Sequence, residues 1–265
     1  MIASLAMYDH PAQRWANDVM WRAIAERLDA RGIAAPRALE RRPVELAWRD
    51  PGLLLAQCCG YPLVADPALA LRVIARPSYD VSDCAPGQHL SRLIVRADEP
   101  ATRLDAFRGR IAAINAPLSN TGVNLFRDAV AGVAAGECFF AAVVTTGSHR
   151  QSALAVRAGA ADIAAIDAVT YAALARYEPE VLRGVRQLGV TRASPALPFV
   201  TARATPAATV LALRAALAEV IADPALAPAR AALFLRDIVP ASVHRYVALR
   251  GLAHAAAARG YPALR

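Results

Sequence analysis

The chain has 265 residues, of which 56% are apolar and 20% are charged, and its formal net charge is +8. This apolar content is ample for a core and excludes a disordered protein, and the length suits two domains or one large one. All 30 basic residues are arginines, mostly scattered singly, and no helix-turn-helix, zinc-finger or RNA-binding motif accompanies them. We therefore interpret the charge as the arginine bias of a GC-rich genome and predict no nucleic-acid partner. A positive field would still attract an anionic ligand.

The hydrophobic pattern predicts strands and helices in alternation. Strands are expected at residues 2–7, 44–48, 53–56, 71–75, 93–95, 110–114, 139–144, 162–166 and 187–190. Helices are expected at residues 12–31, 98–108, 118–134, 148–158, 169–177, 206–221 and 242–257, and a polar loop at 77–88. Such alternation is typical of an α/β protein with mostly parallel sheets and helices on both faces.

The first helix start with polar residues follows the strand at 110–114. Ser119, Asn120, Thr121 and Gly122 stand there in succession. A helix N-terminus offers free N–H groups and a partial positive charge, and Ser and Thr hydroxyls can donate to an oxyanion as well. These residues indicate an anion site without a formal charge. An ordinary helix N-cap is the alternative interpretation.

The second such start follows the strand at 139–144. Ser148 opens the helix, and His149 stands in its first turn, where it could donate to an anion. Asp167 ends the strand at 162–166 and would accept a proton from a protonated oxyanion, orient His149 or meet a ligand amine. A capped or partly buried histidine and a helix N-cap are the alternatives for these two residues.

Tyrosines stand at strand ends in the first half of the chain. Tyr8 and Tyr61 each follow a predicted strand, and Tyr79 lies in the predicted loop. Tyrosine hydroxyls can donate to an anion, although surface packing would also explain each one. Nucleophile elbows, Walker A loops and H-E-x-x-H motifs are absent from the sequence, so we predict no catalytic residue.

The four cysteines are Cys58, Cys59, Cys84 and Cys138, and none forms a C-x-x-C pair. We therefore predict no metal site and no cofactor. Two interpretations stay open: Cys58 or Cys59 pairs with Cys84 in an oxidising compartment, or all four thiols are reduced. The sequence shows neither a signal peptide nor an apolar run of about 18 residues. Either the protein is cytoplasmic, or a leader is missing from this chain.

Several of these motifs together resemble a known family, in matching order and spacing over most of the chain. They resemble the substrate-binding proteins of phosphate, phosphite and phosphonate ABC transporters, a branch of the type 2 periplasmic-binding-protein fold. The motifs that carry the resemblance are Leu53 to Leu63, Leu118 to Gly122, Phe139-Phe140, Thr146 to His149, and Gly159 to Asp167.

The resemblance implies a two-lobed α/β fold with the ligand in a cleft between the lobes. Lobe one would be residues 1–95 plus 193–265, and lobe two would be residues 96–192. It also implies a periplasmic monomer whose partners are an ABC permease, an ATPase and a small anionic ligand. The absent export signal departs from the family's pattern.

Lobe two of such proteins holds the oxyanion through hydroxyls, N–H groups and a histidine. Carried over by the resemblance, these are Ser119, Thr121, Gly122, Ser148 and His149. Lobe one supplies tyrosines, which correspond to Tyr61 and Tyr8, and Asp167 completes the set. Asn120 stands where many relatives have another small residue, which leaves the ligand preference open.

Two alternative functions remain. A cytosolic enzyme on the same scaffold, acting on a small carboxylate or heterocycle, would explain the absent signal and could use His149 and Asp167 as acid and base. Such enzymes take part in menaquinone and thiamine-pyrimidine synthesis. A ligand-sensing module that works through a partner protein is the third hypothesis. Fold alone does not decide between them.

Overall fold

The computed structural model describes residues 1–134 and 138–265. The chain divides into two compact units. The first unit comprises residues 1–88 and 195–246, and the second comprises residues 89–194 and 247–265. A short two-stranded sheet pairs β4 (Gln88–His89) with β10 (Ser194–Pro195), and each of these strands contains a unit boundary.

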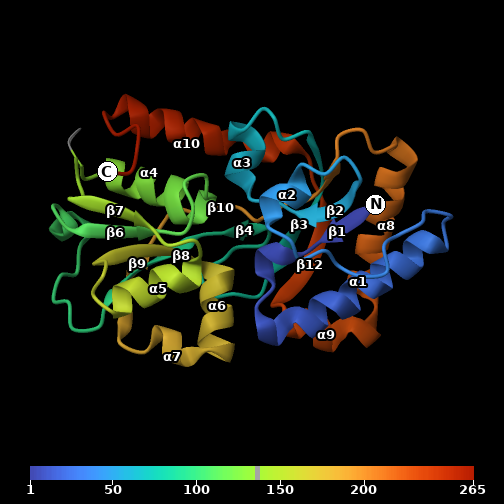
Figure 1. Ribbon diagram of the computed structural model, residues 1–265, viewed down its shortest axis with the longest axis horizontal. Helices are drawn as coiled ribbons and strands as arrows, with labels where there is room; N and C mark the ends of the chain where they lie inside the picture. The colour runs from blue at the N-terminus through green and yellow to red at the C-terminus, as the bar shows by residue number, and fades with distance from the viewer. Residues whose placement is uncertain (135–137) are drawn as a thin grey trace. The chain divides into compact units, whose positions relative to one another are not determined.

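The first unit is built on a five-stranded mixed sheet (Figure 1). Its order is β1 (Ile2–Ser4), β2 (Leu53–Gln57), β11 (Phe199–Ala202), β3 (Leu71–Tyr79) and β12 (Leu235–Pro240). β1 pairs with β2 in parallel, whereas β11 is antiparallel to β2 and β3, and β12 is antiparallel to β3. Strands β1, β2 and β3 therefore run in one direction, and β11 and β12 run in the other.

The helices of the first unit pack on this sheet and on one another. They are α1 (Arg14–Asp29), α2 (Val44–Trp48), α3 (Gly60–Ala65), α8 (Ala207–Ala222) and α9 (Ala227–Ala232). Helix α1 contacts α8 and α9, α8 lies on β3 and β12, and α2 lies on β1 and β2 (Figure 1). Gly32 ends the first helical segment with φ +74°, a left-handed conformation that glycine adopts without strain.

The second unit has its own five-stranded sheet. Its order is β7 (Ala142–Thr145), β6 (Ile111–Ile114), β8 (Ile163–Asp167), β5 (Ser91–Arg96) and β9 (Val185–Val190). β6 is parallel to β7 and β8, whereas β5 is antiparallel to β8 and β9. One direction is in the majority in each sheet, as predicted, but each sheet also contains strands of the other direction.

Helices cover both faces of the second sheet. Helices α4 (Leu125–Ala131) and α10 (Val247–Ala258) lie on one side, and α5 (His149–Arg157), α6 (Ala168–Tyr177) and α7 (Pro179–Leu182) lie on the other (Figure 1). The alternation of side chains along a strand supplies both cores. Ile163 and Ala165 of β8 pack in the cluster with Phe126, whereas Ala164 and Ile166 pack with Ala153.

Short 3₁₀ helices and one π-helical turn complete the chain. The π turn is η4 (Asn120–Asn124). The 3₁₀ segments are η1 (Ala6–Tyr8), η2 (Pro11–Gln13), η3 (Leu104–Phe107), η5 (Pro224–Leu226) and η6 (Val243–Arg245).

The C-terminal segment belongs to the second unit, whereas the expected lobe bounds placed residues 193–265 together in lobe one. Asn124 Nδ2 donates to the Leu249 carbonyl at 3.0 Å, and Arg127 Nη1 donates to the Pro262 carbonyl at 3.0 Å. Tyr261 is fully buried in the cluster that contains Phe126. Residues 89–95 also fall in the second unit, because β5 lies inside its sheet.

Three of the predicted elements are wrong. Residues 44–48 form a helix, because a short apolar run alone does not distinguish a strand from a helix. Residues 98–108 contain only the short η3, since Pro100 disfavours the helical conformation at Glu99 before it. The predicted loop at 77–88 begins later, because β3 continues through Tyr79 by pairing with β12. The sequence pattern did not reveal β11 and β12.

The described cysteines form no disulfide: Cys58 and Cys59 are buried, and Cys138 is exposed. Burial raises the pKa of the Cys58 thiol well above its ordinary value, which keeps that group protonated. No described helix is long and apolar enough to cross a bilayer.

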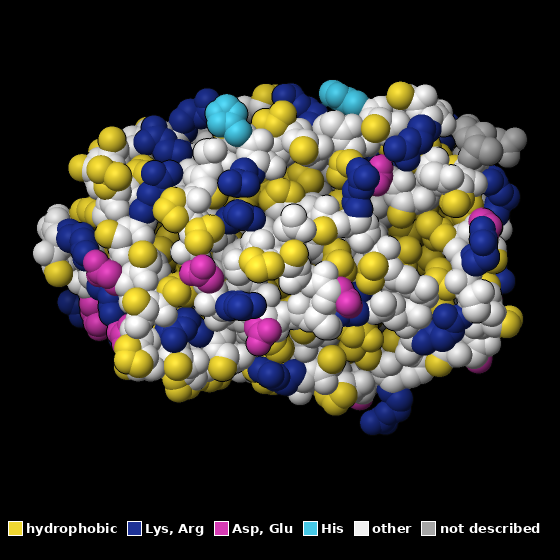
Figure 2. Space-filling view, turned by 180° about the vertical axis from the view of Figure 1, so that it is seen from behind, with side chains coloured by type: hydrophobic (Ala, Val, Ile, Leu, Met, Phe, Trp, Pro, Cys, Tyr) yellow, Lys and Arg dark blue, Asp and Glu magenta, His cyan; other side chains and the backbone are white. Residues whose placement is uncertain are grey.

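The arginines do not gather into one strip on the face shown in Figure 2, where blue side chains alternate with apolar, polar and acidic ones. Several are paired with carboxylates. Arg41 contacts Asp9 and Asp18 at 2.9 and 2.7 Å, and Arg110 contacts Glu99 at 2.8 Å. This distribution agrees with the interpretation of the charge as compositional.

Removing the Phe126 ring should destabilise the second unit. The side chain is fully buried against Phe140 at a centroid distance of 5.6 Å. Phe126→Ala should lower the free energy of unfolding by about 3 to 5 kcal/mol, because it leaves a cavity. Urea unfolding would measure this loss, and Val247→Ala at a half-exposed helix position is the control. A loss for Phe126→Ala no larger than that of the control would contradict the core assignment.

Candidate functional site

The polar residues singled out in the second half of the chain meet at one edge of the second sheet. Because β6 and β8 are parallel, the segments that follow them start at the same edge. β5 begins at this edge, since it is antiparallel to β8, and Ser91 is paired with Asp167. We call the group the second-unit polar cluster, and its members are His89, Ser91, Ser119, Asn120, Thr121, Gly122, Ser148, His149 and Asp167.

The turn after β6 supplies four members of the cluster. Ser119 Oγ accepts a hydrogen bond from the Gly122 N–H at 3.0 Å, so the predicted N-cap is present. Asn120 is fully buried, and its amide donates to Ser194 Oγ at 2.9 Å. The expected α-helix at 118–134 begins here as a π turn, a rare geometry that is frequent at functional sites.

Gly122 is required by close packing against the preceding strand end. A Cβ atom at this position would lie 1.8 Å from Asn115 Oδ1 and 3.1 Å from Ser119 Oγ. The first distance is far below any contact that real atoms make, so a larger residue would displace Asn115 or the turn. The glycine thus sets the path of the backbone that carries Thr121.

Thr121 and His149 join the two helix starts. Thr121 Oγ1 lies 3.2 Å from His149 Nε2, a hydrogen-bond distance. Ser91 Oγ donates to the Thr121 carbonyl at 2.7 Å, which ties the π turn to the start of β5. Ser148 caps α5 by accepting from the Gln151 N–H at 3.1 Å, and its own hydroxyl hydrogen can be donated to another group.

The ionisation of His149 is set mainly by its burial. Burial lowers the pKa of the imidazole, and His89 adds to this effect. The nearby Asp167 carboxylate and the Ala165 backbone favour the charged form but do not overcome burial. His149 is therefore neutral at neutral pH, where it acts as a hydrogen-bonding group.

Asp167 is buried, and both of its oxygens are engaged. Oδ1 accepts from the N–H groups of Val169 and Thr170 at 2.9 and 3.0 Å, so Asp167 caps α6. Oδ2 lies 3.1 Å from His89 Nδ1. Burial alone would raise the pKa of this carboxyl, but His89, His149 and the capped N–H groups hold the pKa below its ordinary value. Asp167 is thus an ionised residue that holds the site together.

The sequence interpretation missed His89. This side chain is 1% exposed and stands two residues before β5. It stands directly after the predicted loop at 77–88, and only the antiparallel pairing of β5 with β8 brings it to Asp167. The one feature of the sequence that could have indicated a functional role for His89 was its position between a polar loop and an apolar strand.

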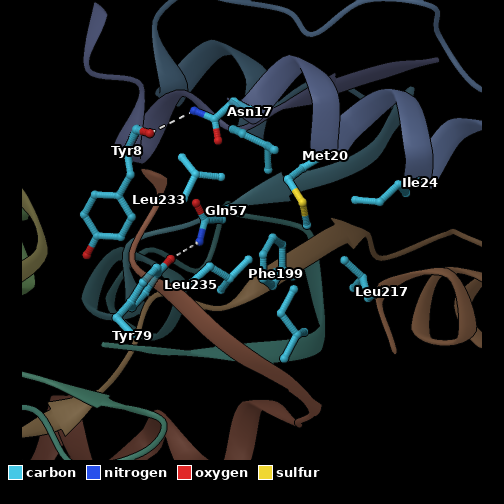
Figure 3. A pocket seen from close by; sticks show the side chains of 12 residues that line it. Tyr8, Asn17, Met20, Ile24, Gln57, Tyr79, Phe199, Leu217, Leu233 and Leu235 are labelled. Atoms are coloured by element: carbon cyan, nitrogen blue, oxygen red, sulfur yellow. Dashed lines mark hydrogen bonds between the residues drawn. The ribbon is translucent and has the colours of Figure 1, made fainter. Parts of the chain in front are cut away.

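The three tyrosines belong to the first unit. The Tyr8 ring meets the Tyr79 ring edge-on at 5.4 Å, and Asn17 donates to the Tyr8 carbonyl at 2.9 Å (Figure 3). Tyr79 is buried in β3, and its hydroxyl accepts from the Gln57 amide at 2.8 Å. Tyr61 is half-buried in the first turn of α3. The role of Tyr8 and Tyr61 at an anion stays a prediction.

Tyr8 and Tyr79 also border a small pocket inside the first unit (Figure 3). Apolar side chains form most of its wall, among them Met20, Ile24 and Phe199. The polar groups at this wall, Gln57 and Asn17, already bond to the tyrosines. The pocket therefore resembles a loosely packed part of the core more than an anion site.

The part of the chain that the structure describes contains no group of side chains suited to bind a metal ion. Groups of three or more His, Cys, Asp or Glu side chains that could hold an ion do not occur there. His89, His149 and Asp167 form a hydrogen-bonding and electrostatic cluster instead. Hydroxyls, N–H groups and imidazoles at helix starts are the groups that bind oxyanions in proteins.

Two α/β units, each built on a five-stranded mixed sheet, are typical of the periplasmic-binding-protein fold. A family model described as "ABC transporter, phosphonate, periplasmic substrate-binding protein" matches residues 55–246. The chain belongs to this family of phosphonate ABC transporter substrate-binding proteins. No curated protein matches the chain.

Solved structures share the fold at low sequence identity. PhnD1 from Prochlorococcus marinus, in complex with methylphosphonate, has a TM-score of 0.75 at 12% identity, covering 96% of each chain. A binding protein component of an ABC phosphonate transporter from Pseudomonas aeruginosa has a TM-score of 0.74 at 15% identity, covering 98% of this chain and 87% of that one. XAC2383 from Xanthomonas citri, bound to chloride, has a TM-score of 0.70 at 16% identity and covers 98% of each chain.

Substituting Gly122 should disturb the π turn. Gly122→Ala places a methyl group against Asn115 Oδ1 and should lower the melting temperature by several degrees, because the Asn115 side chain or the turn must shift. Gly251→Ala is the matched control, since a Cβ there meets nothing within 4 Å and alanine favours the helix. Thermal unfolding would compare the two variants. Equal melting temperatures would contradict the close approach of Asn115.

The partly buried His149 should make stability fall in mild acid. Its folded pKa lies below the unfolded value of about 6.5, so the unfolded chain binds the proton first as the pH falls. Stability is therefore full above about pH 6.5 and declines as the pH falls from there toward the folded pKa. His149→Gln should flatten this slope in urea unfolding. The exposed His254→Gln should leave the slope unchanged, and equal slopes for all three chains would refute the prediction.

Proposed function

We propose that the chain binds a small oxyanion of the phosphonate, phosphate or phosphite type as the solute-binding component of an ABC transport system. The observation that carries the proposal is the convergence of two helix starts, joined by the 3.2 Å contact between Thr121 Oγ1 and His149 Nε2. Family membership and the methylphosphonate complex of PhnD1 support the same ligand class.

Each member of the second-unit polar cluster has a role in this proposal. Ser119 and Ser148 cap their helices as acceptors and remain able to donate their hydroxyl hydrogens. Thr121 and His149 donate to the anion when it replaces their mutual contact. The first N–H groups of α5 lack intrahelical acceptors and add their partial positive charge. Asn120 holds the turn in place through Ser194.

The partners follow from the family. We propose that the protein works as a monomer in the periplasm and delivers its ligand to a membrane permease powered by an ATPase. Tyr8 and Tyr61 remain proposed contributors to ligand binding from the first unit.

We propose that the chain does not act as an enzyme. An enzyme that used His149 and Asp167 as acid and base would need a carboxylate that can reach a substrate. Asp167 is 2% exposed, and its oxygens are engaged by His89 and by two N–H groups of α6. This arrangement favours a supporting role for Asp167.

Calorimetry with methylphosphonate, phosphate, phosphite and sulfate tests the proposal. At least one of the phosphorus oxyanions should bind. Thr121→Val should weaken that binding by about tenfold or more, because a hydrogen bond to a charged group is lost. Thr102→Val, at an exposed position of the same unit, is the matched control and should bind as the unaltered protein does.

Two results would count against the proposal. The unaltered protein would give no heat and no shift in melting temperature with any of the four anions, or Thr121→Val would bind as tightly as Thr102→Val. Loss of binding in Tyr61→Phe, with its helix intact, would support the proposed contribution of the first unit.

A further inference from the structure

His89 is a buried histidine that neither the sequence interpretation nor the family description uses. Its Nδ1 atom lies 3.1 Å from Asp167 Oδ2, and the two side chains are 1% and 3% exposed. Both ring nitrogens are buried, and neither makes a hydrogen bond of ordinary geometry within residues 1–134 and 138–265, although Nδ1 lies close to the carboxylate. Buried polar atoms are almost always paired in folded proteins, so an unpaired one suggests a ligand that is absent from the structure.

The charged and titratable groups around His89 come from several elements. Asp167 ends β8, and His149 begins α5. Arg92 of β5 faces the ring of Tyr171 at 5.2 Å and bonds Gln187. Arg127 of α4 bonds the Pro262 carbonyl and Asn124. The Asp167 carboxylate lies in direct contact with His89, at 3.1 Å.

We infer that His89 is a specificity-determining residue that binds the oxyanion in its protonated form, held in place by Asp167. The inference rests on the proposed function and extends it to the protonation state of the site. Nδ1–H of His89 would face Asp167, and Nε2–H would donate to an oxygen of the anion. The imidazolium would then bridge the carboxylate and the ligand.

The reason is the charge balance of the site. The hydroxyls and N–H groups of the second-unit polar cluster are neutral, and His149 is neutral as well. The buried Asp167 carboxylate would repel an anion unless a positive charge lies between them. A proton on His89 supplies that charge, and Asp167 stabilises the imidazolium and fixes the orientation of its ring.

The proton on His89 Nε2 can come from the ligand or from solution, and protons are conserved in both cases. A monoanionic phosphonate carries a P–O–H group, and its proton passes from that oxygen to His89 Nε2. A dianion brings no proton, so His89 takes one from solution when the dianion binds. In either case the bound state is an imidazolium beside a dianion, so affinity should fall as the pH rises and the proton that the complex holds is no longer present on the free protein or the free ligand.

The experiment combines calorimetry with ¹⁵N-histidine NMR, using methylphosphonate as the probe between about pH 6 and pH 9. In the unaltered protein, binding should convert His89 to the imidazolium form, which ¹⁵N shifts report directly. His89→Gln should bind about tenfold or more weakly at pH 6, with much of its pH dependence lost. His254→Gln, at an exposed position of the same unit, is the matched control.

Asp167→Asn tests whether the carboxylate acts through His89. Asparagine can still cap α6, but it carries no charge, so the pH at which affinity falls should move lower. A merely structural role for Asp167 would weaken binding equally at every pH.

The outcomes separate the two claims. If the unaltered protein binds none of the four anions, the proposed function fails. If it binds methylphosphonate while His89 stays neutral in the complex, or His89→Gln keeps the affinity and pH profile of the unaltered protein, only the inference about His89 is overturned.

Discussion

The second unit depends on how one buried carboxylate is satisfied. Asp167 ends β8 inside the protein, where an uncompensated charge would be strongly destabilising. It is compensated from two directions, by the N–H groups at the start of α6 and by the ring of His89. These contacts fix where α6 begins and how the chain enters β5. The same carboxylate favours protonation of His149, although burial has the larger effect.

The residues around Asp167 explain why we propose a binding site at this edge of the second sheet. Parallel strands β6 and β8 end together, and each leads into a helical segment whose first N–H groups need acceptors. Asp167 caps its own helix completely, whereas Ser119 and Ser148 cap theirs with hydroxyls that keep a hydrogen to donate. The helix start capped by the Asp167 carboxylate therefore repels an anion, whereas the helix starts capped by Ser119 and Ser148 keep a hydroxyl hydrogen that can be donated to an anion. The chemistry of the cap decides which helix starts are available to a ligand.

Much of this could be predicted from the sequence, since the strand, small polar turn and helix at Ser119 and at Ser148 are local patterns. The α/β class and the family resemblance were confirmed. The parts that were missed depend on pairing between distant segments. β11 and β12 join a sheet through residues more than a hundred positions away, and His89 reaches Asp167 only through the β5–β8 pairing. The C-terminal segment likewise contacts η4 through Asn124 and α4 through Arg127, which no local pattern reveals.

Asp167 is charged, whereas His149 is neutral, and this difference affects which ligands the proposed site would accept. A site built only from hydrogen-bond donors favours fully deprotonated oxyanions, because the hydrogen of a P–O–H group would find no acceptor there. A buried carboxylate changes this, since it makes the site unfavourable for an anion unless a proton is bound nearby. Imidazole is the side chain that exchanges a proton near neutral pH, and two imidazoles stand beside Asp167. The combination favours ligands that bring a proton or tolerate one, and phosphorus oxyanions titrate in that range whereas sulfate does not.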